Sequence, residues 1–242
     1  MKMINEFVRY QYKQDVLSAK WVIPFIALLA VFGAMYSILP IDVVGNFSIM
    51  SLVLFLLMAG IGTASQGIEP EVSEQIIILR MQSERKYYIG QVLFLGTLSG
   101  IVTVVCLCYP IILHYWNGKM LFTRNIQVSD IIGGFLLMFA CSFLGCMLGE
   151  IFSPRMIRER KIRFMLSIAF ALISVVRIGI VAEVPITKYI LWIVPPVSDV
   201  VGWFMKEEYF QTGRITGAFF ILMVYAIVLV VIKIELSRIR KF

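Results

Sequence analysis

Long runs without Asp, Glu, Lys or Arg, separated by short charged stretches, are the main pattern along the chain. A helix needs about 20 predominantly apolar residues to cross the hydrocarbon core of a bilayer. Runs of roughly this length or longer occupy residues 21–41, 43–68, 87–118, 131–149 and 215–232, and residues 164–182 form another that only Arg177 interrupts. The pattern predicts an all-α integral membrane protein with six transmembrane helices.

A further apolar segment, residues 189–204, does not fit a seventh span. It is short, contains Asp199, and has Pro195 and Pro196 near its middle. Proline lacks a backbone donor, and a lipid-facing backbone group without a partner is costly in the bilayer core. We predict a broken re-entrant or interfacial element between spans five and six, inside an extracellular segment at 183–214.

Composition and charge agree with this architecture. The chain is 60% hydrophobic and 15% charged, whereas a soluble domain is about 45–50% apolar and about 25% charged. The net charge of +7 could indicate a nucleic-acid partner, but 16 of the 22 Lys and Arg residues lie in the N-terminal tail, the loops after spans two and four, and the C-terminal end. Under the positive-inside rule this asymmetry predicts cytoplasmic termini, a single membrane domain over 1–242, and no nucleic-acid partner.

The N-terminal residues 1–20 have the periodicity of an amphipathic helix. At 100° per residue the basic side chains fall on one stripe and the apolar side chains on the opposite one. The basic set is Lys2, Arg9, Lys13 and Lys20, and the apolar set is Ile4, Phe7, Val8 and Tyr12. This pattern predicts an interfacial helix whose cations lie near membrane lipid headgroups, the alternative being an ordinary positive flank of the first span.

The loop at 67–86, between spans two and three, combines charged residues with a run of exposed apolar ones. Its candidate residues are Glu71, Glu74, Ile76, Ile77, Ile78, Leu79, Arg80, Glu84 and Arg85. A short helix of this composition in a cytoplasmic loop suits docking into a groove of a soluble partner. The alternative is a solvated loop whose isoleucines simply continue into the membrane.

The chain contains no motif for catalysis that we recognise. It lacks a P-loop and an HExxH motif, and His114 is its sole histidine. Its four cysteines all lie within apolar runs, where free cysteine behaves as a small hydrophobic residue. We therefore expect neither enzymatic activity nor a bound cofactor in this chain, and any energy from ATP has to come from a second polypeptide.

Arg177 is the candidate functional residue inside the spans. An arginine there costs about 2.5–3.5 kcal/mol on insertion scales, so it is expected to face protein or water, or to extend to the interface. Asp130, Asp199 or a neighbouring subunit could pair with it. The two interpretations are an intramembrane ion pair and the lining of a polar substrate path.

Two other features predict contacts within the bundle. Small residues four apart let helix backbones approach closely, and such pairs are Gly96 with Gly100 in span three and Gly145 with Gly149 in span four. Glu150, at the cytoplasmic end of span four, is expected to form a salt bridge with the basic loop that follows it.

The loop also resembles a known family. The pattern Glu71-x-Ser73-Glu74-x-Ile76-x-Ile78-Leu79, followed after a polar stretch by Tyr88-Ile89-Gly90-Gln91, is similar to the loop of ABC-2-type permeases. Gln91 stands where that family usually has lysine, and no Gly-Thr pair follows Glu71. The amphipathic N-terminus, the six spans and the broken segment before the last span extend the resemblance over essentially the whole chain.

The resemblance implies a function, a location and partners. It implies the membrane-spanning subunit of an ATP-driven exporter in a bacterial plasma membrane. The 67–86 loop would dock on a separate ABC ATPase subunit, which binds ATP and Mg²⁺. It also implies a second permease subunit, either an identical copy or a related one. Small permeases of this type suggest an amphipathic or hydrophobic substrate, with an antimicrobial peptide favoured over a lipid-linked molecule or a hydrophobic drug. The alternative is a membrane interaction or immunity protein without transport.

Overall fold

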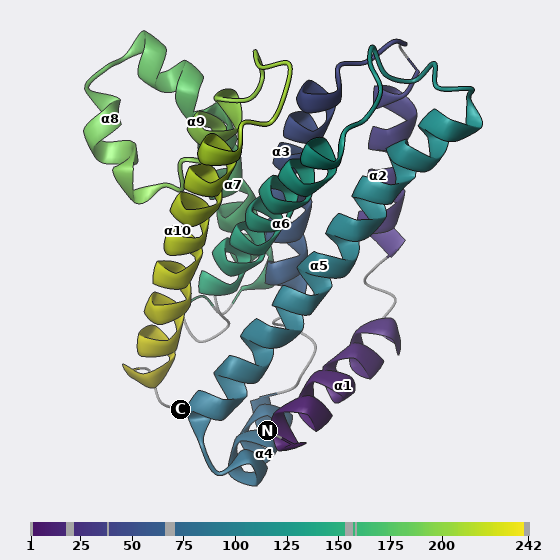
Figure 1. The fold of residues 1–242 in the computed structure, drawn as a ribbon. Coiled ribbons are helices and arrows are strands. Elements are labelled where there is room, and N and C mark those ends of the chain that lie inside the picture. The colour runs from purple at the N-terminus through teal and green to yellow at the C-terminus, as the bar shows by residue number, and fades with distance from the viewer. Residues whose placement is uncertain are drawn as a thin grey trace.

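The fold is entirely helical. The computed structural model describes residues 2–17, 22–37, 39–65, 71–152, 157 and 159–239 (Figure 1). Helices make up 82% of it. Within the described ranges the only β-type pairing is an isolated bridge between Ile41 and Phe122, in two loops. The all-α prediction is confirmed.

Five helices are long and apolar enough to cross a membrane: α3 (Val43–Ser65), α5 (Glu84–Trp116), α6 (Val128–Ile151), α7 (Arg160–Glu183) and α10 (Thr212–Ile239). They indicate a multi-pass membrane protein. The sixth predicted span, at 21–41, contains α2 (Val22–Met35), which is apolar but has only 14 residues in the described part of the chain. This is shorter than the roughly 20 residues that a complete crossing needs.

The two ends of the bundle differ. The N-terminal helix α1 (Lys2–Leu17), the short helix α4 (Glu71–Met81) and the last turns of α10 lie at one end, which we call the terminal end (Figure 1). The connections at 36–37 with 39–42, at 117–127 and at 184–211 lie at the opposite end, which we call the loop end. The long helices run between these two ends, and among them α5 and α10 extend to the level of α1 and α4 (Figure 1).

Helices α3 and α6 form the centre of the bundle. Every residue of α6 from 140 to 150 is buried, and the largest fully buried side chains include Phe47, Phe55 and Met138. The other helices surround this pair, with α5 and α10 against α6 and α7 against α3. Because α6 is enclosed by other helices, it is apolar around its whole circumference, as the near-continuous hydrophobic run of its sequence indicates.

Gly145 and Gly149 allow α6 to approach α3 closely. A Cβ on Gly145 would overlap the backbone of Phe55, and a Cβ on Gly149 would lie 2.7 Å from the backbone nitrogen of Thr63. Only glycine fits at such distances, so the prediction that this small-residue pair packs helices within the subunit is confirmed.

Replacing Gly149 by alanine is therefore expected to destabilise the fold by about 1–3 kcal/mol, because the added methyl group forces α6 away from α3. The matched control is Gly179→Ala in α7, where a Cβ meets nothing within 4 Å. That variant is expected to gain up to about 1 kcal/mol from helix propensity. Thermal unfolding of the purified protein in detergent measures both, and equal midpoints for the two variants would contradict the packing described.

The apolar face of α1 packs on α5. Phe7 is buried, and the ring of Tyr12 packs edge-on against Phe94 while its hydroxyl lies 2.7 Å from the Thr97 hydroxyl. Arg9 and Lys13 point to the exposed side. The apolar stripe of the predicted amphipathic helix thus packs against protein. Lys20, the last residue of the predicted basic stripe, lies outside the described residues.

The segment at 189–204 is broken into short pieces. It begins inside α8 (Thr187–Ile190) and contains η1 (Leu191–Ile193) and α9 (Val197–Gly202). Pro195 and Pro196 lie between η1 and α9. None of these is long enough to span a bilayer. The α9 helix buries Val197, Val200 and Val201 against the bundle, whereas Tyr189 and Trp192 are exposed.

Candidate functional site

The α4 helix presents an apolar pair outward at the terminal end of the bundle. Ile76 and Leu79, three residues apart and so on one helix face, have 58% and 76% of their surface exposed. Ile77 and Ile78 point the other way and are partly buried. A helix with one face anchored and an apolar pair on the other has the form of a docking element.

The remaining predicted loop residues surround this pair. Arg80 and Arg85 are exposed, and Glu84 is half-buried at the first position of α5. Glu71 and Glu74 lie on α4, but their side chains are outside the described part of the structure. The predicted helix in this loop is present, from Glu71 to Met81.

A small hydrophobic cluster fixes α4 to the bundle. We call it the terminal cluster: Phe7, Met81, Tyr87 and Tyr88 are buried in it, with Ile4, Ile77, Ile78 and Ile234 packed around them. The Phe7 and Tyr87 rings lie 5.2 Å apart, and a Cβ on Gly90 would lie 2.6 Å from the Phe7 ring, so α1 and α5 are in close contact here. Helices α1, α4, α5 and α10 thus meet at one point.

A buried charge network lies directly beside the terminal cluster. Its centre is an ion pair between Glu150 of α6 and Lys233 of α10, whose side chains are only 3% and 5% exposed. Gln91 of α5 accepts a hydrogen bond of 2.9 Å from Lys233, and Ser65 of α3 donates one of 2.8 Å to Glu150. Four separate spans therefore contribute one polar side chain each.

The network and the cluster share a boundary. Gln91 donates a hydrogen bond of 2.9 Å to the Tyr87 hydroxyl, and the Lys233 ammonium lies 5.8 Å from the centre of the Tyr88 ring. Lys233 and Ile234 are neighbours on α10, one in the network and the other in the cluster. The side chains packed against α4 are thus linked through Gln91 and Tyr88 to Lys233 of α10, and through Lys233 to Glu150 of α6.

One ion-pair partner of Glu150 is Lys233 on α10, which the sequence analysis did not predict. The salt bridge predicted between Glu150 and the basic loop that begins at Arg155 stays a prediction, because residues 153–156 lie outside the described part of the chain. Lys233 was counted among the cations of the C-terminal end. The pair could have been predicted from the sequence, because Glu150 and Lys233 each follow an apolar run that ends at the same side of the membrane, which places them at similar depth.

Arg177 holds the broken segment to α7. Its Nε lies 3.1 Å from the Asp199 carboxylate, and its Nη1 donates a hydrogen bond of 3.1 Å to the Val194 carbonyl. The arginine is 8% exposed. The structure thus brings Arg177 together with Asp199, one of the partners considered from the sequence, and a role in a substrate path stays a prediction.

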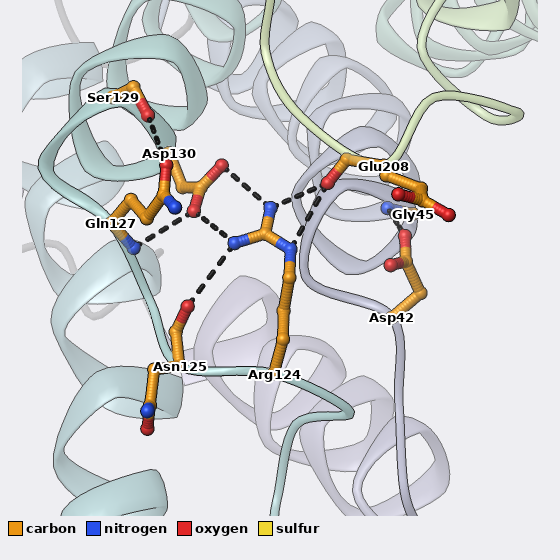
Figure 2. A network of polar contacts seen from close by, with 8 residues as sticks. All are labelled: Asp42, Gly45, Arg124, Asn125, Gln127, Ser129, Asp130 and Glu208. Carbon is orange, nitrogen blue, oxygen red and sulfur yellow. Dashed lines mark hydrogen bonds and ion pairs between the residues drawn. The ribbon is translucent and has the colours of Figure 1, made fainter.

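The other expected partner, Asp130, belongs to a separate cluster at the loop end. Figure 2 shows Arg124 between Asp130 on one side and the Glu208 backbone on the other. Two nitrogens of Arg124 donate to the Asp130 carboxylate at 2.6 and 2.9 Å, and two contact the Glu208 carbonyl at 3.1 and 2.6 Å. The guanidinium also lies 4.2 Å from the centre of the Tyr209 ring.

This arginine ties three loop-end segments together. Asp130 is fully buried and also caps the start of α6 with Gln127. Hydrogen bonding to Asp130 raises the pKa of Arg124 above its ordinary value, so the guanidinium stays charged at any physiological pH. The cluster fixes the connection between α9 and α10 against the beginning of α6.

Arg124→Gln is expected to loosen the α9–α10 connection. Loss of bonds to a buried carboxylate costs about 1.5–3 kcal/mol, which corresponds to at least tenfold more frequent local opening. The measurement is the rate of tryptic cleavage after Lys206, which is exposed in this connection. Lys119→Gln removes an exposed cation at the same end and serves as the control. Equal cleavage rates in the two variants would show that Arg124 does not hold this segment.

The described residues contain no group of three or more His, Cys, Asp and Glu side chains placed to hold a metal ion. His114 is buried, and its Nδ1 accepts a hydrogen bond of 3.4 Å from the backbone of Phe122. Cys106, Cys141 and Cys146 are buried free thiols within the bundle. These side chains serve packing and local hydrogen bonding.

Comparisons with known proteins return no match: no protein-family model, curated protein or solved structure matches this chain.

Proposed function

We propose that this protein is the membrane-spanning permease subunit of an ATP-driven exporter of the ABC-2 type, and that α4 docks on a separate ATPase subunit. One observation carries the proposal. Outside the long apolar helices stands a short helix that presents Ile76 and Leu79 outward, while its other face is anchored in the terminal cluster. A chain without a P-loop needs such an element to receive work from an ATPase.

The proposed topology has six spans with both termini in the cytoplasm. Support for the sixth span comes from connectivity, since α1 lies at the terminal end and α3 begins at the loop end, with α2 between them (Figure 1). Support for the orientation comes from charge, because most Lys and Arg residues belong to the terminal end. The 184–211 connection then lies at the outer face, where α8, η1 and α9 form an interfacial element.

The proposed mechanism links α4 to the spans. Closure of the ATPases on nucleotide moves α4, and the terminal cluster transmits this motion to α5 and α10. The charge network then couples α10 to α6 through Lys233 and Glu150. Two permease subunits, identical or related, enclose a path for an amphipathic or hydrophobic substrate, with a peptide favoured.

The experiment is purification of the full chain from its native membrane in a mild detergent. Recovery of a stoichiometric ATPase that contains a P-loop supports the proposal. A stable chain without an ATPase, under conditions that retain membrane lipids, supports the alternative of an interaction or immunity protein without transport. Vanadate-sensitive ATP hydrolysis by the purified assembly is the second readout.

A further inference from the structure

A large apolar groove opens between three helices of the bundle. It has a volume of about 870 Å³, and its walls come from α2, α3 and α7, with the last turns of α1 at one end. This volume lies within the range of about 300–1,000 Å³ that is typical of ligand sites. The groove shares none of the residues of α4 or the terminal cluster.

The polarity of the groove changes along its length. The walls are apolar from Val53 to Ile61 on α3, opposite Val31 of α2 and Ile168 of α7. From Val53 to Ser65 the helix rises about 18 Å, close to the depth of one leaflet. The two hydroxyls in the wall bond within the protein, Thr63 to the Ala59 carbonyl and Ser65 to Glu150, so the walls present little unmet polarity.

Cations stand at the terminal end of the groove. Arg160 and Lys161, the first residues of α7, line it there and are exposed. Arg163, one turn further along α7, is buried, donates to the Ile157 carbonyl and does not line the groove. The acidic residue among the lining side chains is Asp15, which is buried and has a partner of its own. The described residues that line this mouth therefore carry a net positive charge.

We infer that this groove binds an anionic phospholipid from the leaflet at the terminal end. An acyl chain lies along α2, α3 and α7, and the phosphate lies against Arg160 and Lys161. The groove and such a lipid are complementary in shape and charge. The furrow is about one leaflet deep and has cations at one end, and the lipid has an apolar chain with one charged head. A peptide or a second protein helix would not require the charge to be confined to that end. The inference does not depend on docking of an ATPase.

The test uses the full chain in a non-ionic detergent with an equimolar mixture of dioleoylphosphatidylglycerol and dioleoylphosphatidylcholine. Native mass spectrometry then counts the lipids that remain bound. We expect phosphatidylglycerol to be retained in preference by about tenfold or more, because its headgroup has a net negative charge that the two cations attract, whereas the choline cation neutralises the headgroup of phosphatidylcholine. The double variant Arg160→Gln with Lys161→Gln is expected to remove most of this preference. Arg9→Gln with Lys13→Gln changes the net charge equally on the exposed face of α1 and is expected to leave the preference unchanged.

A second pair of variants tests the apolar part of the groove. Gly60 lies in its wall, and a Cβ there would make ordinary contacts of 3.7 and 3.9 Å with Phe164 and Ile168. Gly60→Leu places apolar side-chain volume in the furrow, and it is expected to reduce retention of both lipids at least fivefold. Gly33→Leu, on α2 where a Cβ meets nothing within 4 Å, is the control and is expected to retain them.

Several results would overturn the inference. Equal retention of the two lipids by the unaltered protein would contradict a site for an anionic headgroup, as would an equal loss of preference in the α1 double variant. Unchanged retention in Gly60→Leu would place the lipid elsewhere. A lipid-free dimer that Gly60→Leu converts to a monomer would show that the groove is an interface between copies of the chain.

Discussion

Replacing Ile76 and Leu79 together by glutamine is expected to abolish recovery of the ATPase and ATP-driven export while the permease itself remains folded. Each apolar side chain contributes about 1.5–3 kcal/mol when it is buried in a partner, so loss of both lowers the affinity by about a hundredfold or more. Glutamine keeps a high helix propensity, and both side chains point away from the terminal cluster, so α4 is expected to stay intact. Co-purification with the ATPase is the primary measurement.

The matched control carries the same change at the loop end. Ile186 and Ile193 are 75% and 76% exposed, and their double replacement by glutamine is expected to leave the ATPase bound. If the α4 variant retained the ATPase, or if the loop-end variant lost it equally, docking through α4 would be wrong. Thermal unfolding of both variants distinguishes loss of docking from loss of folding.

Lys233→Met is expected to produce the largest loss of stability of any single substitution considered. It removes the cation while keeping an unbranched side chain, and the buried Glu150 carboxylate loses the ion pair with Lys233. Breaking a buried pair in this way costs about 3–5 kcal/mol. Because Ser65 still donates to Glu150, we expect the lower part of that range. Thermal unfolding in detergent measures the loss.

Two further variants serve as controls for Lys233→Met, one that removes both buried charges and one that breaks an exposed ion pair. Glu150→Gln combined with Lys233→Met removes both charges and is expected to recover most of the lost stability, because no isolated charge remains buried. Arg214→Gln breaks the pair with Glu207 at the loop end, where the arginine is 50% exposed. We expect less than about 1 kcal/mol there because solvent screens the pair. Equal effects of Lys233→Met and Arg214→Gln would contradict the burial of the Glu150–Lys233 pair.

The sequence was sufficient for the helices because burial in a bilayer or a bundle demands long apolar runs. The runs at 43–68, 87–118 and 131–149 contain most of α3, α5 and α6, and the double proline at 195–196 interrupts the helix where expected. The apolar run at 21–41 did not predict where its helix ends. Hydrophobicity continues to Ile41, whereas the α2 helix ends at Met35 before a turn at Tyr36 and Ser37.

The side-chain partnerships were harder to derive because they depend on how helices rotate and slide against each other. Arg177 had few acidic candidates, and Asp199 lies in the segment that packs on its helix. Glu150 had many possible basic partners. Because cations are common at the ends of spans, Lys233 was used only as evidence for the orientation of the chain in the membrane. Gln91, which stands where the resembling family usually has lysine, bridges Lys233 and Tyr87. Only three-dimensional packing shows that role.

The central claim is that α4 contacts an ATPase, and site-specific photo-crosslinking in the native membrane tests it most directly. A benzophenone amino acid at Leu79 is predicted to capture one protein, an ATPase that contains a P-loop, while the same probe at Ile193 on the opposite end captures none. Crosslinks from Leu79 to lipid alone, or capture of the ATPase from Ile193 rather than Leu79, would contradict the proposed docking surface.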